Sequence, residues 1–192
     1  MPEPALVGIE ADFAEQVAGT EPSKAKLMRE SIGLNFASRD LTDVVIWPVD
    51  KFIPEAMWTS AVSIFAFDAL IQNPDRRFRN PNLFSRGDEL VVFDHELAFS
   101  FIEALFPSAE PWLLSHFDLT EHAFFRRLRR KEIDLTGFTA RLSSLPESVL
   151  PAILAEVPPE WNNEKLARIE EHLVAVAGQA ERFAEEVRRR LA

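Results

Sequence analysis

Three short polar side chains stand at spacings that suit phosphoryl transfer in the segment NPDRRFRNPNLFSRGDELVVFDHE, residues 73–96. Asp75 supplies a carboxylate for an attacking hydroxyl, and Asn80, five residues later, can turn its amide oxygen toward a metal ion. Asp94 would complete a pair of hard oxygen ligands. A magnesium-dependent phosphotransferase needs little more from its side chains, because the transfer depends on positioning and charge stabilisation.

The residues between Asn80 and Asp94 predict a β-hairpin. Apolar residues at 83–84 and 90–93 flank a turn centred on Gly87. Positions 80 and 94 are then equally far from the turn, so antiparallel pairing brings them to the same open end. We therefore expect the two oxygen ligands to converge.

A known family shows the same arrangement. DRxxxN at 75–80, the hairpin and DHE at 94–96 resemble the catalytic and metal loops of the bacterial HipA-like kinases, and phosphatidylinositol kinases share the DRxxxN pattern. The run FDALIQNPDRRFRNPNLF at 67–84 and the tail from 158 to 192 also resemble the compact HipA-like kinase domain. The resemblance thus covers most of the chain.

The resemblance implies a role for each polar residue. Asp75 would be the catalytic residue, Asn80 would bind magnesium, and Asp94 would bind magnesium beside the nucleotide. Asn82 is a candidate for one more contact in the loop. ATP and Mg²⁺ would then support phosphoryl transfer to a hydroxyl of a protein substrate, in a toxin–antitoxin-like setting.

The family also implies parts that this sequence does not display. Such kinases carry upstream a small sheet with a phosphate-covering loop, a lysine for the phosphates and a glutamate on the next helix. The chain has six glycines without a G-x-G-x-x-G pattern. No lysine ends an apolar strand ahead of a helix; the lysines are Lys24, Lys26, Lys51, Lys131 and Lys165. We expect a kinase-like core that lacks the nucleotide-clamping sheet, through truncation, start-site choice or supply by a partner.

The predicted fold class is α+β, mostly α-helical, with a kinase-like C-terminal lobe that carries the catalytic hairpin. We assign residues 1–55 to a remnant or linker part of the N-terminal lobe and residues 56–192 to the helical lobe. Prolines and glycines in the first forty or so residues predict short elements and loops.

Loss of an N-terminal sheet would leave the strand expected at 5–9 as an unpaired remnant. Leu34 and Phe36 would then be exposed. This predicts a sticky surface, for a partner chain or for self-association.

Two helices are predicted with particular clarity. The segment 58–72 is apolar on nearly all sides, so we expect a buried helix that delivers the chain to Asp75 and ends at Pro74. A motif between a buried helix and a hairpin is held rigidly, as catalysis requires. Apolar residues from Leu166 to Val187 recur at spacings of three and four, which predicts a last packing helix.

Two alternatives apply to the polar motif. NPDRRFRNPN can be a surface turn, with Asp94 capping the next element. The DHE triplet can instead be part of a transition-metal site. His95 is expected only to orient its loop, because the other histidines show no recognisable ligand spacing around it; they are His116, His122 and His172.

Basic side chains also lie in and beyond the loop. Arg76 is expected to support the loop, whereas Arg77 and Arg79 face either phosphate or solvent. Residues 124–131, FFRRLRRK, resemble a nucleic-acid-binding pattern. The favoured interpretation turns Phe124 and Leu128 toward the core, with Phe125 as a further candidate, and leaves the arginines as a solvated face. Docking of a peptide or tRNA-like substrate is the weaker hypothesis.

Composition excludes several classes of protein. The chain of 192 residues has a net charge of −10, which argues against broad nucleic-acid binding. It has no cysteine, no run of eighteen apolar residues and no charged-then-apolar leader, so a cytoplasmic location without membrane spanning is expected. Acidity still permits a nucleotide site, because bound magnesium neutralises phosphate charge.

Two function classes remain after these considerations. The first is a HipA-like kinase. The second is a catalytically incomplete, pseudokinase-like binding or regulatory protein, in which a partner covers the exposed N-terminal region.

Overall fold

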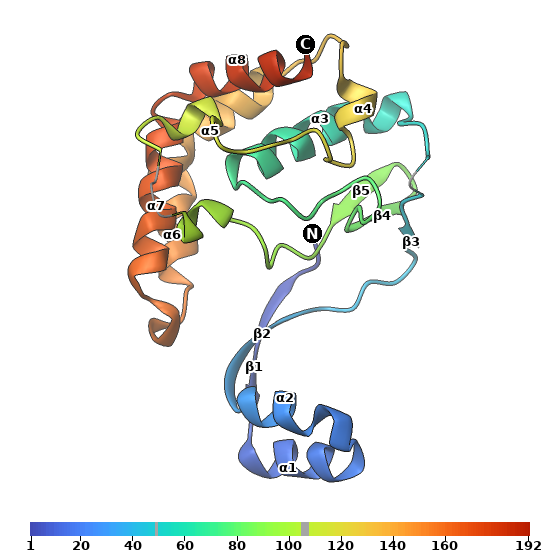
Figure 1. Ribbon diagram of the computed structural model, residues 1–192, viewed down its shortest axis with the longest axis vertical. Coiled ribbons are helices and arrows are strands. Elements are labelled where there is room, and N and C mark those ends of the chain that lie inside the picture. Colours follow the sequence, from blue (N-terminus) through green and yellow to red (C-terminus); the bar gives the residue numbers. More distant parts are fainter. Residues whose placement is uncertain (49, 105–107) are drawn as a thin grey trace. The chain divides into compact units, whose positions relative to one another are not determined.

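The computed structural model describes residues 1–48, 50–104 and 108–192, which form two compact units, Met1–Val44 and Val45–Ala192 (Figure 1). The fold is α+β and mostly helical, as predicted. The described residues form two small sheets, one in each unit: β1–β2 in the first and β3–β4–β5 in the second.

The first unit is an antiparallel ribbon whose strands are joined by two helices. Its elements are β1 (Pro4–Ile9), α1 (Ala11–Thr20), a 3-10 turn (Pro22–Lys24), α2 (Ala25–Glu30) and β2 (Gly33–Ser38). β1 and β2 pair over their whole length, from Pro4 opposite Ser38 to Ile9 opposite Gly33. The prediction of an unpaired strand at 5–9 is therefore wrong, because a second strand from the same unit satisfies its backbone.

This first unit buries few apolar side chains. Among its described residues, Ala14 and Ala18 are the buried hydrophobic ones. Leu34 and Phe36 are exposed, as expected, with 68% of Phe36 accessible. The unit therefore has little core of its own to stabilise it.

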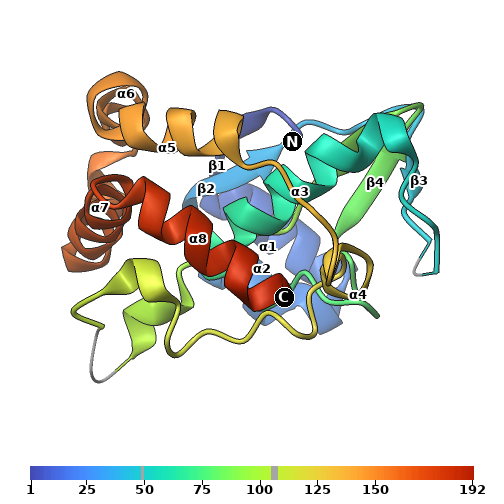
Figure 2. The same ribbon diagram turned by 90° about the horizontal axis from the view of Figure 1, so that it is seen from above.

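The second unit contains the remaining helices and the three-stranded sheet. Its elements are β3 (Val45–Ile46), α3 (Glu55–Leu70), β4 (Leu83–Arg86), β5 (Glu89–Val92), α4 (Phe125–Leu128), α5 (Thr136–Ser148), α6 (Leu150–Ala155), α7 (Glu164–Ala177) and α8 (Ala180–Leu191), with 3-10 turns at Ser100–Glu103, Pro111–Leu113 and Pro159–Trp161. α5 and α8 pack against each other, and α8 also contacts α3 (Figure 2).

Helix α3 is buried along most of its length and leads into the polar motif, as predicted. It ends at Leu70 through a Schellman motif in which Gln72 adopts a left-handed φ of 46° and the amide of Asn73 donates to the carbonyl of Asp68 at 2.9 Å. The expectation that Pro74 ends the helix is wrong, because this motif has already closed the last turn.

The predicted C-terminal helix is split into α7 and α8. Gln179 leaves the helical region with φ −127° and ψ 33°, directly after Gly178. The apolar stripe itself is confirmed, since Val176, Phe183 and Val187 are buried in one core cluster together with α3. The interruption changes the direction of the chain while both helices keep their apolar faces in the core.

The lobe assignment has a different boundary from that of the compact units. The boundary between the units is between Val44 and Val45. The predicted lobes, 1–55 and 56–192, follow instead from the resemblance to HipA-like kinases. That assignment stays a prediction. In the part of the chain that the structure describes, no helix is both long and apolar enough to span a membrane.

Candidate active site

Asp75 lies where the chain leaves the Schellman turn, and neighbouring amides fix its carboxylate. Its backbone amide donates to Oδ1 of Asn73 at 3.1 Å. Its Oδ2 accepts from Nδ2 of Asn82 at 2.8 Å and from Nδ2 of Asn80 at 3.3 Å. The loop therefore brings Asp75, Asn80 and Asn82 together around one half-buried carboxylate.

Arg76 connects this loop to its surroundings from a buried position, with 1% of the residue exposed. Its Nε donates to Oδ2 of Asp68 in α3 at 2.5 Å, and its Nη1 donates to the carbonyls of Asn82 and, at 3.4 Å, Phe93. Its Nη2 lies 2.8 Å from Nε2 of His95. As predicted, Arg76 supports the loop; it also joins the loop to the segment after β5.

Asp68 is the buried counter-ion of this arrangement. It accepts from Arg76, from Nδ2 of Asn73 at 3.1 Å and from Nε2 of His122 at 3.0 Å. Burial alone would raise the pKa of Asp68, but the hydrogen bond from His122 and the charge and hydrogen bond of Arg76 hold that pKa below its ordinary value. Asp68 is thus an ionised carboxylate at the base of the loop.

Sequence reasoning missed Asp68 and assigned no role to His122. Asp68 is the one acidic residue in the largely apolar segment 58–72. That is the one signal that pointed to it, because a buried carboxylate requires partners. His122 lies 54 residues further along the chain. No local pattern could have paired the two.

His95 is a half-buried hydrogen-bond partner of Arg76. Because a guanidinium can only donate, Nε2 of His95 accepts from Arg76. Burial, and then the charge of Arg76, lower the pKa of His95, with Asp68 and Asp94 acting in the opposite direction. Among the described residues, no group of three or more His, Cys, Asp or Glu side chains could hold a metal ion. Within that part of the chain, the transition-metal alternative has no such ligand set.

The predicted hairpin is present as β4 and β5. Leu83 pairs with Val92 and Arg86 with Glu89, so the turn is centred between residues 87 and 88. In this register position 80 aligns with 95 and position 94 with 81. The predicted symmetry is wrong by one residue, although both positions remain at the open end of the hairpin.

The open end of the hairpin is shaped by left-handed backbone. Asn82 and Asp94 adopt φ values of 43° and 54°, a region that Asn and Asp tolerate better than most residues. The amide of Phe93 donates to the carbonyl of Asn82 at 3.2 Å, which extends the pairing of β4 and β5 by one residue beyond Leu83 and Val92. Asp94 thus follows directly on a segment that Arg76 holds, and its side chain is exposed.

The loop also rests on the segment that carries His122. The amide of Phe78 donates to the carbonyl of Glu121 at 2.9 Å, and the amide of Ala123 donates to the carbonyl of Arg76 at 2.9 Å. Arg77 and Asn80 exchange backbone hydrogen bonds at 3.0 and 3.1 Å, which closes the turn between them. The two exposed arginines of the loop, Arg77 and Arg79, are thereby presented at its surface.

The donor chemistry at Asn80 and Asp94 is of the kind that Mg²⁺ prefers. The amide nitrogen of Asn80 donates to Asp75, which leaves the amide oxygen for a cation. Mg²⁺ is commonly held by one or two carboxylates together with water and substrate phosphates.

The whole chain matches one family model. The model is that of the HipA-like kinases, and the match spans residues 1–189. The chain belongs to the HipA-like kinase family. A kinase-related function follows from this membership. No curated protein and no solved structure matches the chain.

Proposed function

We propose that this HipA-like kinase transfers the γ-phosphoryl group of ATP to a hydroxyl, on a protein. The observation that supports this most is the carboxylate of Asp75, oriented by Asn80 and Asn82 in a loop that Arg76 locks. The proposal includes the lobe assignment, 1–55 and 56–192, and a cytoplasmic location.

Asp75 receives the proton of the acceptor hydroxyl. The hydroxyl oxygen attacks the γ-phosphorus, and a new P–O bond forms while the bond to the β–γ bridging oxygen breaks. ADP leaves with that electron pair, and the proton moves to the carboxylate of Asp75. The amides of Asn80 and Asn82 keep the carboxylate in one orientation for this transfer.

Asn80 and Asp94 would hold magnesium beside the nucleotide. When bound, the ion neutralises charge on the phosphates. Arg76 maintains the relation between these two residues, because it contacts both the loop and the segment that leads into Asp94.

A calorimetric titration with ATP and Mg²⁺ tests the proposal. The wild-type chain should bind ATP only when Mg²⁺ is present, and Asp94→Ala should abolish that binding. Asp88→Ala is the matched control, because Asp88 is an exposed carboxylate in the turn of the same hairpin. Failure of the folded wild-type chain to bind, or equal binding by Asp94→Ala, would contradict the assignment.

A second candidate function rests on the first unit. Leu6 and Phe36 lie opposite each other on the β1–β2 ribbon. The exposed fraction is 51% for Leu6 and 68% for Phe36. Exposed apolar patches mark sites of association. In this alternative the protein is a pseudokinase-like regulator, in which the ribbon associates with a second copy of the chain.

Sedimentation measurements separate the two candidates. In the regulatory alternative the wild-type chain self-associates, Phe36→Asp is monomeric, and neither transfers phosphate. A monomeric wild-type chain with kinase activity would rule this alternative out.

A further inference from the structure

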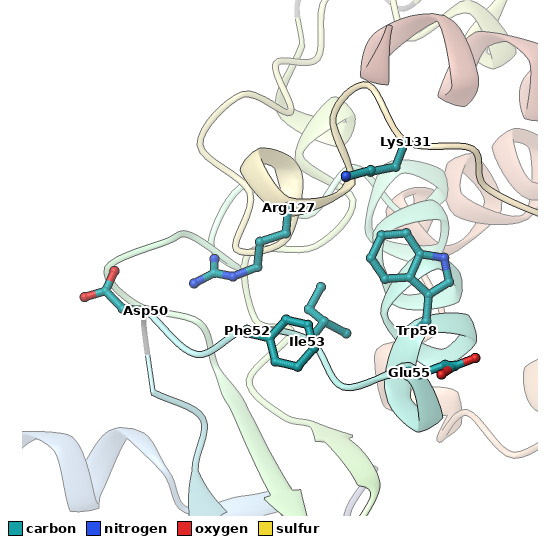
Figure 3. A pocket seen from close by; sticks show the side chains of 7 residues that line it. All are labelled: Asp50, Phe52, Ile53, Glu55, Trp58, Arg127 and Lys131. Atoms are coloured by element: carbon teal, nitrogen blue, oxygen red, sulfur yellow. The ribbon is translucent and has the colours of Figure 1, made fainter.

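A groove outside the proposed active site has an apolar wall, two basic side chains and two acidic ones. It has a volume of about 650 Å³, and we call it the Trp58 groove (Figure 3). Its lining residues are Asp50, Phe52, Ile53, Glu55, Trp58, Arg127 and Lys131. None of the predicted site residues lines it, so it calls for an explanation of its own.

The apolar wall is accessible in the free molecule. Phe52, Ile53 and Trp58 lie together in Figure 3, and 76% of Phe52 is exposed although it stands beside the buried Ile53. An exposed phenylalanine at the rim of a groove gains from being covered. With such an open rim, the groove suits a side chain of a bound polypeptide better than an enclosed small molecule.

The other wall belongs to a basic segment in an acidic protein. Five of the six residues from 126 to 131 are Arg or Lys, whereas the chain carries a net charge of −10. Phe124 and Leu128 are buried, as predicted, and this leaves the basic side chains at the surface. Lys131 forms no ion pair with any residue that the structure describes. Asp50 and Glu55 line the same groove, so an acidic residue of a bound polypeptide would complement the basic side chains where it faces Lys131 and Arg127.

The groove is connected to the catalytic loop through Arg127. This residue lines the groove, and its guanidinium carbon lies 5.5 Å from the ring centre of Phe78, which stands between Asp75 and Asn80 in the loop. Its Nε donates to the carbonyl of Lys51 at 2.8 Å, so it also holds the segment that carries Phe52. A polypeptide in the groove would therefore bind beside the loop.

We propose that the Trp58 groove docks the protein substrate, through a segment in which a large apolar side chain is flanked by acidic residues. The apolar side chain covers Phe52 and Trp58, and the acidic residues face Lys131 and Arg127. The identification of the bound segment as substrate rests on the proposed kinase function; the binding itself does not.

Fluorescence anisotropy with a short labelled peptide tests the groove. The probe carries a Leu-Phe pair flanked by glutamates; in two control peptides lysines replace the glutamates or glycines replace the Leu-Phe pair. We expect only the first peptide to bind. Phe52→Ser should weaken it about tenfold, since a buried aromatic contact is lost, and Lys131→Glu about fivefold, since an exposed ion pair is reversed.

Matched variants test whether the effect is local. Phe13→Ser and Lys26→Glu make the same changes at exposed positions of the first unit and should leave binding unchanged. The proposal is overturned if the folded wild-type chain does not bind the peptide, or if Phe52→Ser and Lys131→Glu bind it as tightly as the wild type. Displacement of the peptide by a single-stranded oligonucleotide would replace the substrate assignment with a nucleic-acid site.

The active-site variant separates this proposal from the proposed function. Asp94→Ala should bind the peptide as the wild type does, because it lies outside the groove. Peptide binding without ATP binding would refute the kinase function and keep the docking groove. ATP binding without peptide binding would refute the docking groove and keep the kinase function.

Discussion

Asp75 takes its orientation from two asparagine amides, and this gives a substitution at this residue a specific outcome. Asp75→Asn keeps an acceptor oxygen for Asn82 but loses the proton acceptor. Transfer should therefore fall by about 10²- to 10⁴-fold, the usual contribution of a general base, while the melting temperature stays unchanged. Phosphate incorporation and thermal unfolding measure the two effects.

Asp88→Asn is the control for this prediction, because it makes the same change at an exposed position on the hairpin turn. Full transfer activity in Asp75→Asn would remove Asp75 from the catalytic role.

Arg76 is a buried charge whose removal leaves Asp68 without its guanidinium partner. Arg76→Met should lower the free energy of unfolding by about 3–5 kcal/mol, as expected when one member of a buried ion pair is lost. Urea unfolding followed by tryptophan fluorescence measures this change. Lost activity should accompany the lost stability, because Arg76 contacts both Asn82 and His95.

A double-mutant cycle checks the physical reason. Asp68→Asn together with Arg76→Met should cost less than the sum of the two single changes, by about 0.5–3 kcal/mol. Additive costs would show that the two side chains stabilise the protein independently.

At the scale of elements, α3 ends at a strained backbone conformation of Gln72 that a substitution can relieve. Gln72 occupies a left-handed conformation that costs an L-residue about 1–2 kcal/mol, whereas glycine loses about 0.5–1 kcal/mol of backbone entropy instead. Gln72→Gly should therefore raise the free energy of unfolding by roughly 0.5–1 kcal/mol. Gln72→Ala, which keeps the strain, is the control and should change stability little. A destabilised glycine variant would mean that the glutamine side chain itself contributes.

The elements also show what a sequence can and cannot predict. The apolar composition of α3 and the apolar runs on either side of the hairpin turn are local, so both were predictable. The break at Gln179 was not, because the apolar spacing continues across it. The β1–β2 pairing and the contact of Asp68 with His122 depend on residues far apart in the chain, and local pattern carries no information on them.

The same reasoning applies to the site. DRxxxN was visible as a motif, and its resemblance to a kinase family supplied the roles. The one-residue shift in the hairpin register was not visible, because it depends on whether the turn is centred on Gly87 or beside it. The burial of Arg76 and its contact with His95 required the three-dimensional arrangement.

At the scale of the whole molecule, the two compact units differ in how much core they contain. Ala14 and Ala18 are the buried hydrophobic residues among those described in the first unit, whereas the second unit holds an extended cluster built on α3 and α8. Amide protons of β1 and β2 should therefore exchange much faster than those of α3. Hydrogen exchange at low protein concentration measures this directly.

Hydrogen exchange at several protein concentrations gives the outcome that would contradict this expectation. If protection of β1 and β2 rises with protein concentration, the ribbon is covered by a second copy of the chain, as the regulatory alternative requires. If β1 and β2 are protected as strongly as α3 in dilute solution, the first unit is stable although it has a small core and no second copy covers it.

The contacts that assemble the catalytic loop also determine when it can form during synthesis. Asp68 and His122 are separated by 54 residues, and Arg76 and His95 by 19. Contacts over such separations form only after the intervening loops have closed. A nascent chain emerges with Asp75 well ahead of His122, so the loop stays without its buried support until that later segment has left the ribosome. The order of translation thus delays assembly of the loop until the chain has been made beyond His122.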